Sequence, residues 1–83
     1  MIRVLYFARL REEVGTGEES LALPAGVHTV GALTARLRAR GERWDEALGG
    51  RPVLVAVNQT LSASEGALAD GDEIAYFPPV TGG

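Results

Sequence analysis

The feature that most constrains this chain is the absence of cysteine from a sequence of only 83 residues. A chain of this length makes one domain, because two separate hydrophobic cores cannot be built from so few residues. Without cysteine, no disulfide can stabilise that domain, and thiolate metal sites and a catalytic cysteine are excluded as well. We therefore expect a fold held by packing alone, in a cytoplasmic protein.

Composition and charge narrow the class further. Hydrophobic residues make up 46% of the chain and charged residues 23%, which is ordinary for a globular domain. No apolar run approaches the roughly 20 residues that span a bilayer, and the N-terminus lacks the layout of a signal peptide. The net charge of −3 argues against binding that relies on a basic surface. We expect neither a membrane nor a nucleic acid as a partner.

Five segments have the apolar, β-branched and aromatic composition of β-strands. They are expected at residues 1–7, 19–23, 53–57, 60–61 and 73–77. Residues 53–57 (VLVAV) are a continuous apolar run, which predicts a central strand buried on both faces. Asn58-Gln59 and residues 70–72 (DGD) provide turns before the last two strands. Pro78-Pro79 ends the final strand, because proline cannot donate to a β-ladder.

One segment has the pattern of an amphipathic helix. Val30, Leu33 and Leu37 stand at positions i, i+3 and i+7, so that they share one inward-facing stripe. Thr29 is suited to cap the start of this helix, because its hydroxyl can accept a hydrogen bond from a free backbone N–H. Gly41 is suited to end it as the first residue in a left-handed conformation.

Shorter helical segments are expected at residues 9–14 and 42–48. The order along the chain is then strand, strand, helix, strand, short strand, strand. A hairpin followed by a crossover helix and a parallel central strand gives a mixed sheet of about five strands with the helix across one face. This α+β arrangement is that of the β-grasp, or ubiquitin-like, fold, which we expect over residues 1–77.

Few side chains could carry chemistry. His28 is the single histidine, and without cysteine or a second histidine it cannot build a usual zinc site. The serines lack the sequence context of a catalytic nucleophile, and residues 70–73 (DGDE) lack the ligand spacing of an EF-hand loop. No glycine-rich nucleotide-binding motif is present. We therefore predict no metal site, no bound cofactor and no catalytic side chain.

The C-terminus, residues 78–83 (PPVTGG), is different. Pro78-Pro79 stiffens the exit from the domain, which reduces the entropy lost when a flexible tail enters a channel. Gly82 and Gly83 remove every side chain beside the terminal carboxylate. Six residues can reach on the order of 20 Å. We predict an extended tail whose carboxylate, on Gly83, can enter a partner's active site and be adenylated there.

At this point the sequence closely resembles the sulfur-carrier small subunits of molybdopterin synthase, within the MoaD/ThiS family of ubiquitin-like proteins. The resemblance covers the whole chain. It is carried by residues 1–11, Gly15-Thr16, Arg43-Trp44, residues 57–61 and, most specifically, residues 70–83.

The resemblance implies a three-stage cycle. An E1-like enzyme uses ATP to adenylate Gly83, and a sulfur donor, such as a cysteine desulfurase or a rhodanese-type protein, converts the adenylate to a thiocarboxylate. The tail, with Pro78, Pro79, Val80 and Thr81 leading to Gly82 and Gly83, then enters the large synthase subunit and gives its sulfur to a cyclic pyranopterin phosphate. The family assembles as a heterotetramer of two large and two small subunits, and its catalytic side chains lie on the large subunit.

A docking surface can also be predicted. Phe7, Leu61 and Phe77 are large apolar residues near strand ends on the tail side of the expected sheet. An exposed apolar cluster there would be the core of a partner interface, with Arg11 as a polar contact at its rim. The alternative is that all three belong to the core of the domain. The resemblance favours the interface.

Three other functions remain open. The thiazole sulfur carriers of thiamine synthesis share the fold and the Gly-Gly end, although residues 77–81 (FPPVT) are not typical of them. A ubiquitin-like protein modifier would join its C-terminus to lysines of other proteins, since this chain has no lysine itself. An inert interaction domain could end in Gly-Gly by chance.

Overall fold

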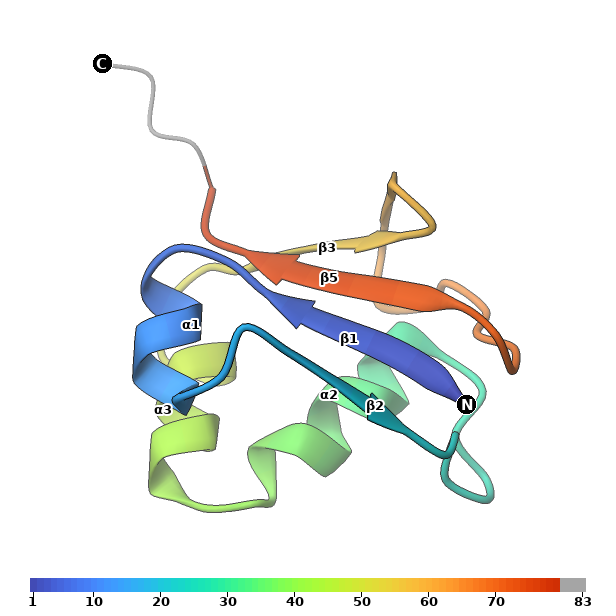
Figure 1. Cartoon of the computed structure of the whole chain (residues 1–83), viewed down its shortest axis with the longest axis horizontal. Coiled ribbons are helices and arrows are strands. Elements are labelled where there is room, and N and C mark those ends of the chain that lie inside the picture. The colour runs from blue at the N-terminus through green and yellow to red at the C-terminus, as the bar shows by residue number, and fades with distance from the viewer. Residues whose placement is uncertain (80–83) are drawn as a thin grey trace.

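Within residues 1–79, which the computed structural model describes, five strands form one sheet and three helices cover one of its faces (Figure 1). The strands are β1 (Ile2–Tyr6), β2 (Glu18–Leu21), β3 (Leu54–Val57), β4 (Thr60–Ser62) and β5 (Glu73–Phe77). The helices are α1 (Arg9–Val14), α2 (Val30–Arg38) and α3 (Glu42–Gly49). The predicted strand and helix positions are therefore confirmed to within a few residues.

The strand order is β2-β1-β5-β3-β4. β1 and β5 are parallel, with Tyr6 opposite Tyr76, while the other neighbouring pairs are antiparallel. This mixed sheet with a helix crossing one face has the β-grasp topology that the sequence predicts. β5 ends at Phe77, and the predicted tail positions Val80, Thr81, Gly82 and Gly83 lie outside the described residues.

The identity of the central strand differs from the prediction. β5, and not residues 53–57, lies in the middle of the sheet and runs parallel to β1. β3 pairs antiparallel with β5, and the Leu54 side chain is 39% exposed, so this strand is not buried on both faces. The run is apolar because one side of β3 packs on the core while the other belongs to an exposed apolar surface.

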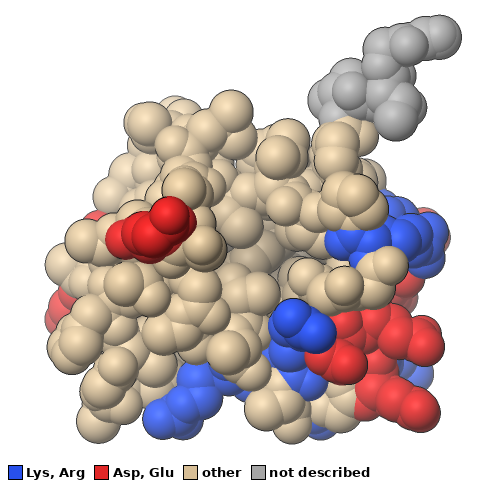
Figure 2. All heavy atoms as spheres, turned by 180° about the vertical axis from the view of Figure 1, so that it is seen from behind, with Lys and Arg blue, Asp and Glu red and all other residues tan. Residues whose placement is uncertain are grey.

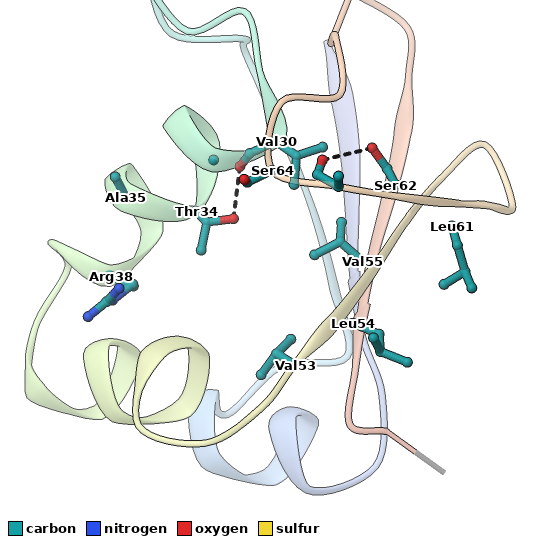
Figure 3. A pocket seen from close by; sticks show the side chains of 12 residues that line it. Val30, Thr34, Ala35, Arg38, Val53, Leu54, Val55, Leu61, Ser62 and Ser64 are labelled. Atoms are coloured by element: carbon teal, nitrogen blue, oxygen red, sulfur yellow. Dashed lines mark hydrogen bonds between the residues drawn. The ribbon is translucent and has the colours of Figure 1, made fainter.

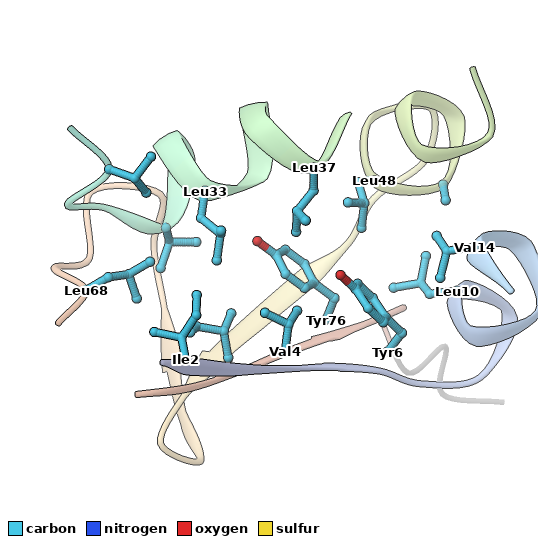
Figure 4. Packing of buried hydrophobic residues seen from close by; sticks show 14 residues of the cluster. Ile2, Val4, Tyr6, Leu10, Val14, Leu33, Leu37, Leu48, Leu68 and Tyr76 are labelled. Carbon is cyan, nitrogen blue, oxygen red and sulfur yellow. The ribbon is translucent and has the colours of Figure 1, made fainter. Parts of the chain in front are cut away.

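The core lies between the sheet and the helices (Figure 4). Alternate residues of β1 and β5 point into it, and the stripe on α2 meets them from the other side. These side chains are at most 2% exposed: Ile2, Val4, Tyr6, Val30, Leu33, Leu37, Ile74 and Tyr76. Thr29 caps α2 as predicted, since its Oγ1 accepts from the backbone N–H of Ala32 at 3.2 Å.

The end of α2 corrects a second detail. The helix stops at Arg38, with Ala39 as its C-cap in the right-handed region, rather than at Gly41. Gly41 has φ of 149° and instead precedes α3, where it is the N-cap residue. The glycine therefore serves the corner between two helices, because its lack of a Cβ lets the chain change direction there.

A polar network ties this helical corner to the sheet. The Tyr6 hydroxyl donates to Glu19 at 2.8 Å, and Arg40 donates to both Glu19 oxygens at 2.8 and 2.9 Å. The Arg40 guanidinium lies 4.6 Å from the centre of the Trp44 ring, which packs edge-on against Tyr6. The hydrogen bonds from Arg40 hold the pKa of Glu19 below its usual value, so its carboxylate stays ionised beside the core.

Candidate functional site

The sheet face turned away from the helices carries the candidate site. Because successive side chains of a strand point to opposite faces, the neighbours of the buried residues in β1 and β5 must point outward. We call the apolar residues on this side the outer apolar face: Leu5, Phe7, Leu54, Ala56, Leu61, Ala75 and Phe77. No helix covers this side within the described residues (Figure 1).

Strand register arranges the outer apolar face in two rows. In the first row, Leu61 lies opposite Ala56, Ala56 opposite Ala75, and Ala75 opposite Leu5. In the second row, Leu54 lies opposite Phe77. Phe7 extends this second row, because its N–H donates to the carbonyl of Tyr76 at 3.0 Å and so continues the β1–β5 ladder. The two alanines therefore lie between larger side chains.

Exposure distinguishes this surface from the core. Leu61 is 66% exposed, Phe7 48% and Leu54 39%, and Phe77 is half-buried. Among residues 1–79, the exposed large apolar side chains are Leu61, Phe7, Leu54 and Met1. A contiguous exposed apolar patch is typical of a surface that docks a partner.

The C-terminal exit is part of the same surface. Phe77 is the last residue of β5 and belongs to the second row of the outer apolar face. Pro78 is half-buried and Pro79 is exposed, and both follow directly from it. A partner that covers the outer apolar face would therefore also contact the start of the segment that leads to Gly83.

Arg11 stands at one border of this surface. It is exposed on α1, and its side chain lies across Gly17, where an added Cβ would come within 3.1 Å of Nε. Arg11 lines a surface hollow of about 500 Å³ together with Leu5 and Phe7. Among the described residues Arg11 has no carboxylate within ion-pair distance, whereas Arg3 in the same hollow is paired with Glu18 at 2.8 Å. Within the described residues, Arg11 is therefore a cation without a carboxylate partner at the border of the outer apolar face.

The structure thus places Phe7, Leu61 and Phe77 on one sheet face, with Arg11 at its border. Sequence reasoning missed Leu5, Leu54, Ala56 and Ala75, which complete the two rows. Leu54 and Ala56 stand on either side of Val55, and alternation along a strand places them on the opposite sheet face from it. Because the whole run is apolar, its polarity pattern does not reveal this period of two residues.

A second hollow lies on the flank of the sheet, between α2 and the β3–β4 pair (Figure 3). This groove has a volume of about 700 Å³, and Leu54 and Leu61 of the outer apolar face also line it. Its ionisable side chain is Arg38, which is paired with Asp45 at 2.8 Å. The groove therefore offers apolar packing rather than acid–base groups.

Much of the molecular surface in one view carries no charged side chains. In the view from behind they gather along the lower and right-hand parts of the molecule, apart from one acidic patch (Figure 2). Several are paired with opposite charges at 2.8–2.9 Å, as in Arg9–Glu13–Arg51. Residues 1–79 contain no cluster of three potential metal ligands, and His28 is exposed. None of the helices described is long and apolar enough to cross a bilayer.

Fold and surface together define a ubiquitin-like β-grasp protein with an apolar sheet face beside its C-terminal segment. A model of the ThiS family matches residues 4–83. The chain therefore belongs to the ThiS family.

Two bacterial relatives match the chain over its full length. A protein of Escherichia coli K12 is 51% identical over 83 residues, and one of Haemophilus influenzae is 45% identical over 83 residues; each match covers 100% of both chains. Both are named molybdopterin synthase sulfur carrier subunit.

Several solved structures match the chain over nearly its full length. A Pyrococcus furiosus protein described as molybdopterin converting factor, subunit 1, has a TM-score of 0.78 at 32% identity, over 95% of this chain and 97% of that one. A complex of subunits 1 and 2 of molybdopterin-converting factor from Helicobacter pylori matches with a TM-score of 0.67 at 25% identity, over 99% and 97%. Small archaeal modifier protein 1 of Haloferax volcanii has a TM-score of 0.62 at 31% identity, over 95% and 97%.

Proposed function

We propose that this chain is the sulfur carrier of molybdopterin synthesis and that Gly83 is its reacting residue. The observation that carries the proposal is the 51% identity, over the full length, to a relative named molybdopterin synthase sulfur carrier subunit. The composition of residues 78–83 supports it, because two glycines give a partner's active site close access to the terminal carboxylate.

The chemistry follows from what a carboxylate lacks. A carboxylate is a poor electrophile, so an E1-like enzyme first uses ATP to form the acyl-adenylate on Gly83 and releases pyrophosphate. The adenylate then has AMP as a leaving group, which a sulfur donor's persulfide displaces to form an acyl disulfide. A second thiol cleaves that disulfide, which reduces the transferred sulfur, releases the thiocarboxylate and leaves the two remaining sulfurs joined in a new disulfide. The thiocarboxylate gives its sulfur to the cyclic pyranopterin phosphate. Two loaded carriers supply the two sulfurs of each product.

The domain itself has a docking role in this proposal. The outer apolar face binds the large synthase subunit, with Phe7, Leu61 and Phe77 at the interface and Arg11 at its border. Docking brings Pro78 and Pro79 to the mouth of the active site, and Val80, Thr81 and Gly82 lead Gly83 into it. The complex of two subunits in the Helicobacter pylori structure supports a partner of this kind. Catalytic side chains are then supplied by the large subunit, in a heterotetramer of two large and two small subunits.

A protein modifier is the second candidate. The likeness to small archaeal modifier protein 1 favours it, since that protein has the same fold and 31% identity. Both functions begin with adenylation, and they differ in the nucleophile that follows: sulfur in one case and a lysine amine in the other.

Intact-mass measurement separates these functions. The purified chain is incubated with an E1-like activating enzyme, ATP, a persulfide sulfur donor and a thiol reductant, and its mass is then recorded. A sulfur carrier gains the mass difference between sulfur and oxygen, whereas a modifier appears joined to other proteins. The matched control is the chain without Gly83, which should keep its fold and lose all loading. Normal loading of that control would exclude Gly83 as the reacting residue.

A further inference from the structure

Leu61 is the most exposed large side chain of the outer apolar face, and it lies on a short strand at the edge of the sheet. It lies in the middle of β4, a strand of three residues at the edge of the sheet. With 66% of its surface exposed, Leu61 has little contact with the core that could fix its position. Its location must therefore be set by the hairpin that joins β3 to β4.

The turn of this hairpin is two residues long. Val57 lies opposite Thr60, and Asn58 and Gln59 between them have φ of 49° and 70°. Two successive left-handed residues make the tight turn whose twist suits a β-hairpin. Asparagine is tolerated in this conformation better than most residues, which accounts for Asn58 at the first position.

Asn58 also makes three hydrogen bonds where the chain enters β5, two to Glu73 and one to Asp72. Its N–H donates to the carbonyl of Glu73 at 2.8 Å, and its Oδ1 accepts from the N–H of Glu73 at 3.0 Å. Its Nδ2 donates to Oδ1 of Asp72 at 3.0 Å. The last bond has an ionised acceptor, and such bonds are stronger than those between neutral groups.

Asp72 connects this turn to the rest of the sheet. Its second carboxylate oxygen accepts from the N–H of Ala69 at 2.8 Å, and its backbone carbonyl accepts from the N–H of Arg3 in β1 at 3.0 Å. Asp72 is therefore held by β1 and by the preceding loop. Through Asn58, it fixes the hairpin turn to the central pair of strands.

We propose that Asn58 and Asp72 are positioning residues that hold Leu61 in place for docking of the large synthase subunit. The proposal rests on the docking role of the outer apolar face given under the proposed function. Neither residue belongs to that face; both act through the hairpin that carries Leu61. Loss of their side-chain bond leaves the turn and its backbone hydrogen bonds, but it lets the edge strand move relative to β5.

Exchange of the two side chains tests the proposal, because the bond is directional. Asn58→Asp places two carboxylates against each other. Asp72→Asn replaces one acceptor oxygen by an NH2 group, which then faces another donor: either the N–H of Ala69 or the NH2 group of Asn58. The double exchange restores every bond: the carboxylate now at position 58 accepts from the amide at position 72 and from the N–H of Glu73, and the amide oxygen at position 72 accepts from the N–H of Ala69. Affinity for the purified large subunit is measured by calorimetry, with the melting temperature of each full-length variant as the fold control.

The expected result is a loss of affinity of about tenfold in each single variant and a return to within about threefold of the original value in the double exchange. In a Leu61→Ala background, Asn58→Asp should weaken binding no further, which a general loss of stability would not explain. Where Asn58→Asp lowers the melting temperature too far, Asn58→Gly keeps the left-handed turn without the amide and should give the same loss of affinity.

Two outcomes would contradict different claims. Unchanged affinity in both single variants, together with weak binding by Leu61→Ala, overturns the positioning role alone. Unchanged affinity in Leu61→Ala and Phe77→Ala overturns the docking role of the outer apolar face, and the positioning role with it.

Discussion

The two faces of the β-grasp sheet are built from the same strands but solve different problems. On the covered face, Tyr6, Ile74 and Tyr76 are at most 1% exposed, and the polar atoms they bring inside have partners. On the open face, residues next to them in the chain, such as Phe7 and Phe77, remain partly or largely exposed to solvent. Burial on the covered face stabilises the fold, whereas the open face leaves apolar area exposed for binding a partner. A substitution should therefore change stability or binding according to its face.

The largest effect on folding is expected for Leu33→Ala on the covered face. Leu33 is fully buried on α2, and removing its side chain leaves a cavity in the core. Such changes cost about 2–5 kcal/mol of unfolding free energy. Urea unfolding measures the loss, and the folded fraction should bind the large subunit with its original affinity. Weaker binding by folded Leu33→Ala would show that the two faces are not independent.

Phe77→Ala is the matched change on the open face. Because an aromatic residue in the middle of an interface is often a hot spot worth about 2 kcal/mol, we expect its affinity for the large subunit to fall by about 30-fold. Its melting temperature should fall less than that of Leu33→Ala, since Phe77 is only half-buried. If its stability falls as far as that of Leu33→Ala and its folded fraction binds normally, Phe77 belongs to the core.

The sequence predicted individual elements well because local rules govern them. Residues 73–76 alternate between small or polar and large apolar side chains, Pro78 follows Phe77, and β5 has the predicted bounds 73–77. Thr29 caps α2 because a hydroxyl beside free N–H groups forms the same hydrogen bond in any fold. Pairing between strands is not local in this way. Nothing within residues 53–57 could show that the last strand, and not this one, lies beside β1.

The candidate site was predicted in part for the same reason. Phe7, Leu61 and Phe77 stand out by size near strand ends, and the fold places them on one face. Leu54 was misread as buried, because it lies in the same apolar run as residues that pack on the core and yet is 39% exposed on the outer apolar face. Ala56, on the same face, is buried as predicted. The hydrogen bonds of Asn58 depend on contact with Asp72, 14 residues later, and so could not be read from spacing.

Alkaline pH should weaken the covered face selectively. Burial raises the pKa of Tyr76 to about 12, and burial together with the hydrogen bond to Glu19 raises the pKa of Tyr6 well above its usual value of 10.0. Both phenols stay neutral in the folded chain, while in the unfolded chain they ionise near pH 10. Their contribution is therefore complete below that pH and is lost as pH rises from it through the folded pKa values, by up to about 1.4 kcal/mol per pH unit for each tyrosine.

Urea unfolding from about pH 9 to about pH 11 measures this slope. Tyr76→Phe is the matched control, because it keeps the ring and removes one ionisable group, so its slope should be about half as steep. Thr34, which bonds the Tyr76 hydroxyl at 2.8 Å, still donates to the carbonyl of Val30 in that variant. An equal slope in both proteins would mean that Tyr76 does not contribute to the pH dependence.

The smallest effect is expected in the hairpin turn between β3 and β4, at the edge of the open face. Gln59 has φ of 70°, a conformation that glycine adopts without strain, and asparagine followed by glycine is the preferred pair for this turn. Relief of that strain is partly offset by the greater freedom of glycine in the unfolded chain, so Gln59→Gly should stabilise the protein by about 0.5 kcal/mol. Its affinity for the large subunit should not change, because the Asn58–Asp72 bond remains. Asn58→Gly relieves backbone strain in the same turn but removes that bond, and it should lose affinity. The difference between these two glycine variants therefore isolates the side-chain bond from the turn conformation, and equal affinities would assign the position of Leu61 to the turn alone.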